Sequence, residues 1–338
     1  MTNPTRIVHV LDDLAMGGVT RALKNFEHPK LKDIGAHEIA DIRKEKVRAA
    51  SPDDIAVVHF TANWQKLGWL LDLKTRGGFS RIILIEHTYT RGYEASEVKP
   101  KNRFRLMLRL AYHLVDQVVA VSENQRDWML ELRLSPASKI APIPQSRLCE
   151  DLLKLPPKPR DDGPLQIRAF GRFHKQKGFD LLIQAMQRVP AHMATLKIAG
   201  AGPDKARLQD LSSQLGHVEI CQSFKSPVQF LSAADIVAVP SRWEAFGLVG
   251  TEARAAGRPI IAAQIDGLCD QLDDSGFGHS ANSVPSLVRA IYCAALANDL
   301  AKRGQQARTR AADEFDTMID RWHSLLSQQD QIERALAI

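Results

Sequence analysis

Cysteine is scarce in this sequence: there are four among 338 residues, with no Cys-x-x-Cys pair and no histidine at metal-ligand spacing. We therefore expect neither a disulfide framework nor a structural zinc site. No stretch has the roughly 20 uninterrupted apolar residues that a membrane-spanning helix needs. The amino terminus lacks the apolar core of a secretory signal peptide. These absences predict a protein that stays in the cytoplasm.

Motifs typical of several enzyme classes are also missing. There is no full Gly-x-Gly-x-x-Gly turn with an acidic residue at the right distance, which argues against a dinucleotide-dependent dehydrogenase. The acidic pairs at residues 12–13, 161–162 and 273–274 do not have the Asp-x-Asp form after a buried strand. We therefore predict no metal site.

What the sequence has instead is an excess of positive charge, with a formal net charge of +6 and a pI near 9.1. Such a charge suits an anionic partner. Because no helix-turn-helix, zinc-finger or aromatic ribonucleoprotein motif accompanies it, nucleic acid is not the expected partner. The densest basic cluster, residues 99–109, alternates with apolar residues as on an amphipathic helix. That helix could lie on anionic lipid headgroups, or its apolar side could pack on its own sheet.

Short apolar, β-branched runs alternate with helical patterns along the chain. They lie at residues 7–11, 55–60, 82–85, 118–121, 166–170, 195–199, 218–220, 236–239 and 260–263. Fully apolar strands separated by helices predict an α/β protein whose parallel sheets are covered on both faces. A stretch rich in proline and charge divides the two series and is typical of an interdomain linker.

We therefore expect two Rossmann-like, doubly wound domains, each with a ligand crevice beyond the carboxyl ends of its strands. The first domain is predicted at 1–155, the linker at 156–164 and the second domain at 165–312. The remaining segment, 313–338, contains an amphipathic helical pattern that includes Trp322.

The most informative segment is residues 240–259. A buried strand leads into a loop that carries Glu244, and the helical pattern after the loop carries Glu252. A glycine in the loop lets the backbone approach a ligand closely. The backbone N–H groups that would face an anion there are those of Gly247, Leu248 and Val249. Taken singly, Glu244 could be a solvated loop residue and Glu252 a partner of the helix dipole, but together they predict a sugar-nucleotide pocket.

A second motif follows the strand that ends at Phe170. Residues 171–178 form a glycine turn that brings Arg172 and Lys177 to the start of a helix. A planar guanidinium and a point charge at a helix amino terminus suit a diphosphate. The alternative is an ordinary basic surface loop.

Five further positions are weaker candidates. Gly17 and Gly18 lie at a strand-to-helix junction, where the backbone could approach a phosphate or where a helix could simply begin. Gly200 and Gly202 follow strand 195–199 and leave room for the edge of a ligand, although such a pair is more often a tight turn. His87 follows strand 82–85 at the edge facing the crevice, where a lone histidine is more usually structural.

Together these motifs resemble the signature of the retaining glycosyltransferases of family four. The resemblance implies the GT-B fold, in which two Rossmann-like domains face each other across a deep cleft. It implies that Glu244 contacts the transferred sugar and Glu252 holds the ribose, while Arg172 and Lys177 stabilise the leaving diphosphate. His87 would reach the sugar. The remaining substrate-binding positions would be Gly17, Gly18, Gly171, Gly200, Gly202, Phe246, Gly247, Leu248 and Val249.

The implied reaction moves a sugar from a nucleoside-diphosphate sugar, such as a UDP-sugar, to a hydroxyl with retention of configuration and without metal or cofactor. The acceptor would be a glycan or lipid-linked saccharide of a bacterial cell-surface polysaccharide such as lipopolysaccharide, at the inner face of the cytoplasmic membrane. The chain departs from the family pattern at residues 144–146 and 266–270. The alternatives are a sugar-nucleotide epimerase of the same fold and a non-catalytic sugar-nucleotide-binding protein.

Overall fold

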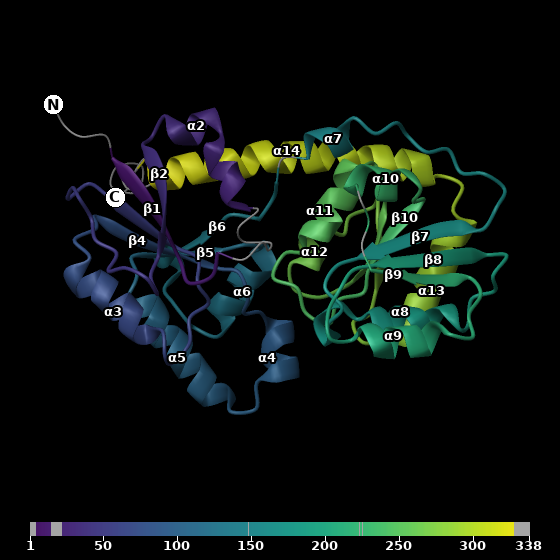
Figure 1. The fold of residues 1–338 in the computed structure, drawn as a ribbon, viewed down its shortest axis with the longest axis horizontal. Helices are drawn as coiled ribbons and strands as arrows, with labels where there is room; N and C mark the ends of the chain where they lie inside the picture. Colours follow the sequence, from purple (N-terminus) through teal and green to yellow (C-terminus); the bar gives the residue numbers. More distant parts are fainter. Residues whose placement is uncertain (1–4, 15–21, 148, 223, 225, 328–338) are drawn as a thin grey trace. The chain divides into compact units, whose positions relative to one another are not determined.

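The computed structural model describes residues 5–14, 22–147, 149–222, 224 and 226–327. The chain divides into two compact units. The first unit comprises Met1–Arg147 with Phe315–Ile338, and the second comprises Leu148–Glu314. Each unit contains one six-stranded sheet flanked by helices (Figure 1). The α/β class expected from the alternating apolar runs is confirmed.

The sheet of the first unit is parallel throughout, in the order β2-β1-β3-β4-β5-β6. Its strands are β1 (Arg6–Leu11), β2 (Ala36–Asp41), β3 (Ile55–Val58), β4 (Arg81–Glu86), β5 (Gln117–Ala120) and β6 (Ile140–Pro142). The chain passes from β1 outward to β2 and then continues on the opposite side with β3. The order of the strands therefore reverses between β1 and β3.

Helices cover both faces of this sheet. The helical segments are η1 (Leu23–Glu27), α2 (Pro29–Lys32), α3 (Leu67–Arg76), α4 (Arg91–Glu97), α5 (Lys101–His113), α6 (Glu123–Glu131) and η2 (Ala137–Lys139). Val8 and Val10 of β1 pack in one core with residues of α3, α5 and α6. Because side chains alternate along a strand, His9 points to the other face, where its ring lies 4.4 Å from that of Phe26.

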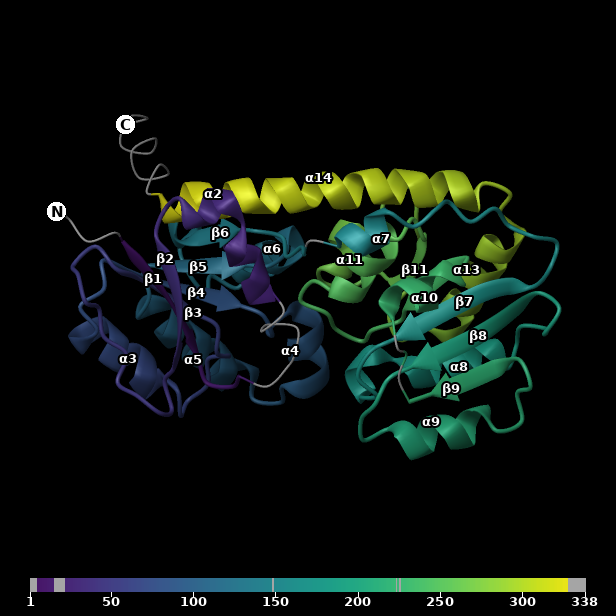
Figure 2. The ribbon, with the colours of Figure 1, turned by 45° about the horizontal axis from the view of Figure 1, so that its top comes forward.

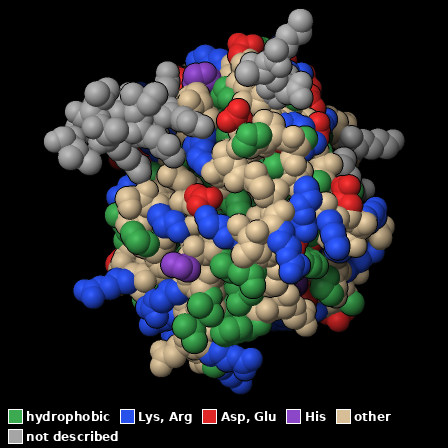
Figure 3. All heavy atoms as spheres, turned by 90° about the vertical axis from the view of Figure 1, so that its left-hand side faces the viewer, with side chains coloured by type: hydrophobic (Ala, Val, Ile, Leu, Met, Phe, Trp, Pro, Cys, Tyr) green, Lys and Arg blue, Asp and Glu red, His purple; other side chains and the backbone are tan. Residues whose placement is uncertain are grey.

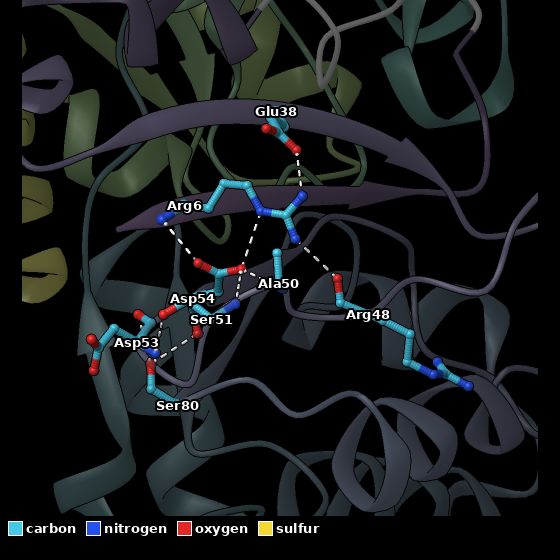
Figure 4. Close-up of polar contacts among 8 residues, drawn as sticks. All are labelled: Arg6, Glu38, Arg48, Ala50, Ser51, Asp53, Asp54 and Ser80. Atoms are coloured by element: carbon cyan, nitrogen blue, oxygen red, sulfur yellow. Dashed lines mark hydrogen bonds and ion pairs between the residues drawn. The ribbon is translucent and has the colours of Figure 1, made fainter. Parts of the chain in front are cut away.

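At the amino ends of its strands, the first sheet is fastened by the buried carboxylate of Asp54 (Figure 4). Asp54 accepts hydrogen bonds from the backbone N–H and the Nε of Arg6, both at 3.1 Å. It also accepts from the backbone of Ala50 at 2.7 Å and of Ser51 at 3.2 Å. Burial raises the pKa of this carboxyl, but the backbone donors and Arg6 outweigh it and lower the pKa overall.

The sheet of the second unit is also parallel, in the order β12-β11-β10-β7-β8-β9. Its strands are β7 (Leu165–Phe170), β8 (Ala194–Ala199), β9 (Val218–Cys221), β10 (Ile236–Val239), β11 (Ile260–Ala263) and β12 (Phe277–His279). The chain runs outward from β7 to β9 and then returns to the other side of β7 at β10. The strand order therefore reverses between β7 and β10.

Helices again lie on both faces of the sheet (Figures 1 and 2). The helical segments are α7 (Glu150–Leu153), η3 (Lys175–Lys177), α8 (Phe179–Met186), α9 (Lys205–Ser212), α10 (Pro227–Ser232), α11 (Leu248–Ala255), α12 (Leu268–Gln271) and α13 (Val284–Leu296). Helices α8 and α13 share one core with β7 and β8. Residues of α7, α10 and α11 share the opposite core.

The last helix, α14 (Leu300–Leu326), contributes to both units. In the first unit its carboxyl end is held by the buried Arg81, which donates to the carbonyls of Leu325 and Leu326, both at 2.7 Å. The ring of Trp322 packs on Phe26 with centroids 5.0 Å apart. The division after Arg147 lies ahead of the linker expected at 156–164, because the intervening residues Cys149, Leu152 and Leu155 are buried in the core of the second unit.

The basic segment 99–109 forms most of α5. Met107 and Leu108 are buried in the core of the first unit, which is the packing expected of an apolar side that covers its own sheet. Leu106 and Leu110 are exposed. None of the helices in the described residues is both long enough and apolar enough to span a bilayer.

Candidate functional site

The two loops that carry the predicted motifs leave neighbouring strands at the point where the strand order reverses. Strands β7 and β10 pair in parallel, with Ile167 opposite Ile236. The loops at their carboxyl ends, residues 171–178 and 240–247, therefore emerge side by side. In doubly wound sheets the ligand crevice lies outside this switch point.

Hydrogen bonds and one close glycine contact join the two loops. The backbone N–H of Arg242 donates to the carbonyl of Gln176 at 2.7 Å, and the side chain of Gln176 donates to the carbonyl of Trp243 at 3.1 Å. Gly178 has a φ of +63°, and a Cβ at this position would lie 2.1 Å from the carbonyl oxygen of Pro240. Only glycine permits this approach, so the loops hold a fixed relative position.

An ion pair reinforces the junction of the loops. Asp180, in the first turn of α8, accepts two hydrogen bonds from the guanidinium of Arg242, both at 2.8 Å, and one from Arg207 at 3.0 Å. Burial raises the pKa of the Asp180 carboxyl, but the hydrogen bonds and charge of Arg242 lower it overall. A bidentate guanidinium–carboxylate pair also fixes the geometry of both side chains.

Two of the predicted catalytic residues meet directly. Lys177 Nζ lies 2.5 Å from Glu244 Oε2, and Ser241 Oγ donates to the same oxygen at 3.2 Å. The side chains retain 21% and 11% of their exposure, so a ligand can reach them. Among the described residues, no donor contacts the other carboxylate oxygen of Glu244, Oε1. Glu244 can therefore accept a hydrogen bond from a ligand hydroxyl, while Lys177 provides a positive charge beside it.

Arg172 differs from Lys177 in having no partner. It is exposed, and no hydrogen bond or ion pair joins its side chain to another residue in the described part of the chain. Arg172 thus supplies an uncompensated positive charge in the same loop as Lys177. Such a guanidinium is suited to binding a phosphate.

The start of α11 provides backbone donors beside this pair. Gly247 is the N-cap, with a φ of +98°, and no side chain caps the helix. The first N–H groups of a helix lack intrahelical acceptors and carry the positive end of the helix dipole. Leu248 and Val249 begin the helix and are half-buried. Glu252 lies further along α11 and is buried.

Phe246 belongs to the interior, since its side chain is 3% exposed. Its carbonyl accepts a hydrogen bond from Gln271 Nε2 at 2.6 Å, and the same amide donates to the Gly247 carbonyl at 3.2 Å. The structure thus places Phe246 as a support for the loop.

The glycines after β8 lie against the backbone of the loop that follows β7. A Cβ on Gly200 would lie 1.9 Å from the carbonyl oxygen of Gly171, and a Cβ on Gly202 would lie 2.4 Å from that of Phe173. Phe173 N–H also donates to the Ala201 carbonyl at 2.8 Å. The space beside both glycines is therefore filled by the backbone of the β7 loop, and these residues allow close packing of two loops.

Three predicted site residues belong to the first unit. Gly17 and Gly18 lie outside the described residues. His87 follows β4, in a loop held by the buried carboxylate of Glu86. Glu86 accepts from the backbone of Thr88 at 2.9 Å and of Tyr89 at 3.0 Å. Burial raises the pKa of Glu86 and lowers that of His87 to about 4.

Sequence reasoning missed the residues that support Glu244. Its backbone N–H donates to Asp266 Oδ2 at 3.2 Å, and its carbonyl accepts from Gly267 N–H at 3.0 Å. A Cβ on Gly267 would lie 2.1 Å from the carbonyl oxygen of Ala245, which explains a glycine there. An Asp-Gly pair in the loop after strand β11 indicates a turn, but it does not indicate which loop that turn contacts.

Comparison with known proteins locates the strongest similarity in the second unit. Residues 165–297 match the family model described as Glycosyl transferases group 1. A D-inositol 3-phosphate glycosyltransferase of Xylanimonas cellulosilytica is 36% identical over 159 residues, which are 44% of this chain and 37% of that protein. An uncharacterized glycosyltransferase of Methanocaldococcus jannaschii is 37% identical over 115 residues, 32% of this chain and 30% of that one. The chain thus spans about a third of the length of these curated relatives.

Similarity to solved structures extends over the whole fold. Anabaena HepE in complex with UDP-glucose has a TM-score of 0.69 at 18% identity and covers 98% of this chain and 99% of its own. A glycosyltransferase from Rickettsia africae has a TM-score of 0.71 at 18% identity, with 97% and 99% coverage. Both units therefore have the folds of the two halves of a GT-B protein, and the similarity to the group 1 glycosyltransferases lies within the second unit.

Proposed function

We propose that this chain is a retaining glycosyltransferase that moves a sugar from a nucleoside-diphosphate sugar to a hydroxyl without a metal ion. The observation that carries the proposal is the Lys177–Glu244 pair at the switch point, beside the unpartnered Arg172 and the uncapped start of α11. Cations and backbone amides suit a diphosphate, and a partly free carboxylate suits the hydroxyls of a sugar.

The residues divide the chemistry between binding and charge stabilisation. In the transfer, the bond from the anomeric carbon to the diphosphate oxygen breaks and a bond to the acceptor oxygen forms on the same face of the sugar. The acceptor proton passes to the departing phosphate oxygen, so no enzyme base is consumed. Arg172 and Lys177 would stabilise the charge that develops on the diphosphate. Glu244 would hold the sugar in place, and Glu252 would hold the ribose.

We propose that the nucleotide of the donor is UDP, because the similar Anabaena structure contains UDP-glucose. The direct test is to measure thermal stabilisation by UDP-, GDP- and ADP-sugars, first with the native chain and then with Arg172→Ala and Glu252→Gln. We expect stabilisation by a UDP-sugar that both substitutions weaken. Lys175→Ala is the matched control, since Lys175 lies in the same loop but outside the proposed site.

Turnover then separates the proposal from its rivals. Incubation of the stabilising donor with bacterial glycans and lipid-linked saccharides should yield a product whose anomeric NMR signal has the configuration of the donor. Inversion would contradict the retaining mechanism, and loss of activity with chelator would contradict metal independence. Release of free sugar from the donor without an acceptor would favour an epimerase. Binding without turnover on any acceptor would favour a sugar-nucleotide sensor.

A surface of the first unit supports our proposal that the chain contacts the inner face of the cytoplasmic membrane. Leu106 and Leu110 of α5 are 49% and 42% exposed, and Arg103 lies over the ring of the exposed Trp64, 5.5 Å from its centroid. Figure 3 views the side of the molecule on which α3 lies, where Lys and Arg side chains are interspersed with hydrophobic ones. Apolar residues among cations suit the headgroup region of an anionic bilayer.

Vesicle sedimentation tests this surface. We expect the chain to sediment with vesicles that contain phosphatidylglycerol and to remain in solution with phosphatidylcholine alone. The double substitution Leu106→Ser with Arg103→Ser should abolish sedimentation. Binding that persists in the double variant would place the membrane contact elsewhere.

A further inference from the structure

Gln271, the last residue of α12, holds two consecutive peptide groups ahead of α11. Its Nε2 donates to the carbonyl of Phe246 at 2.6 Å and to the carbonyl of Gly247 at 3.2 Å. The residue is buried, with 1% of its surface exposed, and all of these residues belong to the second unit. One side-chain amide therefore holds the part of the loop from which α11 begins.

The neighbours of Gln271 determine which way its amide faces. The two backbone carbonyls can only accept hydrogen bonds, so the amide nitrogen must face them. The amide oxygen then faces the other way, where it lies 3.5 Å from Nη2 of Arg254 in α11. Arg254 is held in turn by two hydrogen bonds to the carboxylate of Glu314 in α14, at 2.7 and 2.6 Å. The position of the amide is thus fixed from both sides.

Gly250, in the first turn of α11, provides the space that the amide occupies. A Cβ at this position would lie 2.3 Å from Gln271 Oε1, whereas non-bonded carbon atoms pack best at about 3.5–4.0 Å. A side chain at residue 250 would therefore displace the amide from the carbonyls that it holds. Substitution of Gly250 is an independent way to disturb these contacts without changing Gln271.

The planarity of the peptide group converts the two contacts into a direction for two N–H groups. The peptide groups of the described residues are trans, so the C=O of one residue and the N–H of the next point to opposite sides. Because the Phe246 carbonyl points toward the buried Gln271, the N–H of Gly247 points away from it. In the same way, the Gly247 carbonyl sets the direction of the Leu248 N–H.

The two N–H groups have no acceptor in the part of the chain that the structure describes. Neither the N–H of Gly247 nor that of Leu248 donates to a protein atom there. Leu248 is the first residue of α11, at the positive end of the helix dipole. Glu244, which contacts Lys177, lies beside this turn, since a Cβ on Gly247 would be 3.0 Å from Glu244 Cγ. The free donors thus lie close to the charged pair of the proposed site.

We propose that Gln271 is a positioning residue that directs the N–H groups of Gly247 and Leu248 toward the diphosphate of the sugar-nucleotide donor. Gln271 does not touch the donor, and its effect passes through the orientation of two peptide groups. The identity of the anion rests on the proposed function, whereas the orientation of the peptide groups does not.

The direction of the Leu248 N–H is tested first. Leu248 and Leu268 are the only leucines that follow a glycine in the sequence, so ¹³C-carbonyl glycine with ¹⁵N-leucine selects their amide signals, and Leu248→Met identifies the first. Inorganic diphosphate should shift the Leu248 signal. It should leave that of Leu268, whose N–H already donates to the Ile265 carbonyl at 3.1 Å. An unshifted Leu248 signal overturns the proposal.

Gln271→Met then removes the donor while keeping the length of the side chain. We expect the affinity for UDP to fall about tenfold, as for one lost hydrogen bond to a charged group, and the response of Leu248 to diphosphate to shrink. Gln264→Met, at an exposed glutamine directly after β11, is the matched control and should change neither. A UDP affinity in Gln271→Met equal to that of the control overturns the positioning role.

Uridine separates a positioning role from general damage to the unit. Because uridine has no phosphate, its affinity should be the same in the native chain and in Gln271→Met. An equal loss of affinity for uridine and for UDP would show that the substitution disturbs the whole pocket, and it would overturn the proposal.

Gly250→Ala provides the second variant. It should weaken UDP binding and the Leu248 response as Gln271→Met does, because it displaces the same amide. The double variant should lose no more than the larger of the two single losses, and multiplicative losses overturn the inference. Should Gln271→Met fail to fold, Gly250→Ala alone gives the comparison with the native chain. A native chain that binds diphosphate at Leu248 but no sugar nucleotide contradicts the proposed function and leaves the role of Gln271 intact.

Discussion

The two units share a parallel, doubly wound architecture but build their polar sites in different ways. In the second unit, charged residues on two loops, Lys177 and Glu244, meet beyond the strand ends. In the first, four buried or half-buried histidines of lowered pKa form a hydrogen-bonded chain from strand to strand of the sheet; they are His37, His9, His59 and His87. The charged site can be recognised from contiguous motifs, because each loop follows one strand. The histidine chain exists only once the order of the strands is known.

The largest effect is expected from Lys177→Ala, which attacks the charged site. Loss of one donor that stabilises developing charge should lower turnover by about 10²–10³-fold, and it also leaves Glu244 without its cation. Steady-state kinetics with the stabilising donor measure this loss, with Lys175→Ala as the control. A turnover in Lys177→Ala close to that of the control would remove Lys177 from the proposed machinery.

Acidification should instead lower mainly the free energy of unfolding of the first unit. For His9 and His87, whose pKa values are lowered to about 3 and about 4, the unfolded chain binds protons at a higher pH than the folded one. Their stabilisation is complete above the unfolded value of about 6.5 and is lost as the pH falls toward 4, by about 1.4 kcal/mol per pH unit for each histidine. Protonation of Glu86, whose pKa burial raises, offsets part of this loss.

Hydrogen exchange followed by mass spectrometry at pH 7 and pH 5 resolves the two units. Peptides from β1, β3 and β4 should lose protection first. The second unit also holds a buried histidine of lowered pKa, His279, so we expect it to lose protection to a smaller extent. Equal loss in both units would show that the histidine chain does not govern the acid response.

Much of the fold follows from the sequence because the central strands are continuous apolar runs. Strand β2 was not predicted, since as an edge strand it mixes exposed and buried residues in the pattern Ala36–Asp41. Strands β6 and β12 have three residues each, too few for a pattern. Local composition therefore predicts the strands that are buried on both faces and misses three of the four edge strands. The exception is the edge strand β9, which was predicted at 218–220.

Prediction of the site residues was limited for a similar physical reason. Loop residues such as Arg172 and Glu244 could be predicted because strand, glycine turn and helix follow one another in the chain. The Asp266 support for Glu244 and the histidine contacts could not, since they join residues 22 to 50 positions apart. Gly200 was singled out as leaving room for a ligand, whereas its missing side chain makes room for the backbone of Gly171.

The substitution Asp54→Asn tests whether the stability of the first unit can be changed without changing donor binding by the second unit. The neutral amide replaces a buried carboxylate that accepts from three backbone N–H groups and the Arg6 side chain. We expect the free energy of unfolding of this unit to fall by about 2–3 kcal/mol. Asp53→Asn is the matched control, because Asp53 is exposed and its hydrogen bonds to Ser51 and Ser80 use only its backbone.

Thermal unfolding followed by calorimetry measures both variants. The affinity of the second unit for the sugar nucleotide should be unchanged in Asp54→Asn at temperatures where the chain is folded. A destabilisation shared by Asp53→Asn, or a loss of donor affinity, would show that the effect is not confined to the strand ends of the first sheet.

The smallest effect is expected from Ser241→Ala, which removes one neutral donor from Glu244 and leaves Lys177 in place. Ser241 Oγ donates to the same Oε2 that Lys177 contacts, at the longer distance of 3.2 Å. A hydrogen bond to a charged acceptor contributes about 1.5 kcal/mol at the low end of its range, so turnover should fall about tenfold. Because both donors act on one oxygen, the double variant with Lys177→Ala should lose less than the product of the two single losses. Strictly multiplicative losses would mean that Ser241 and Lys177 act on different steps, and the carboxylate would no longer be the point at which their effects meet.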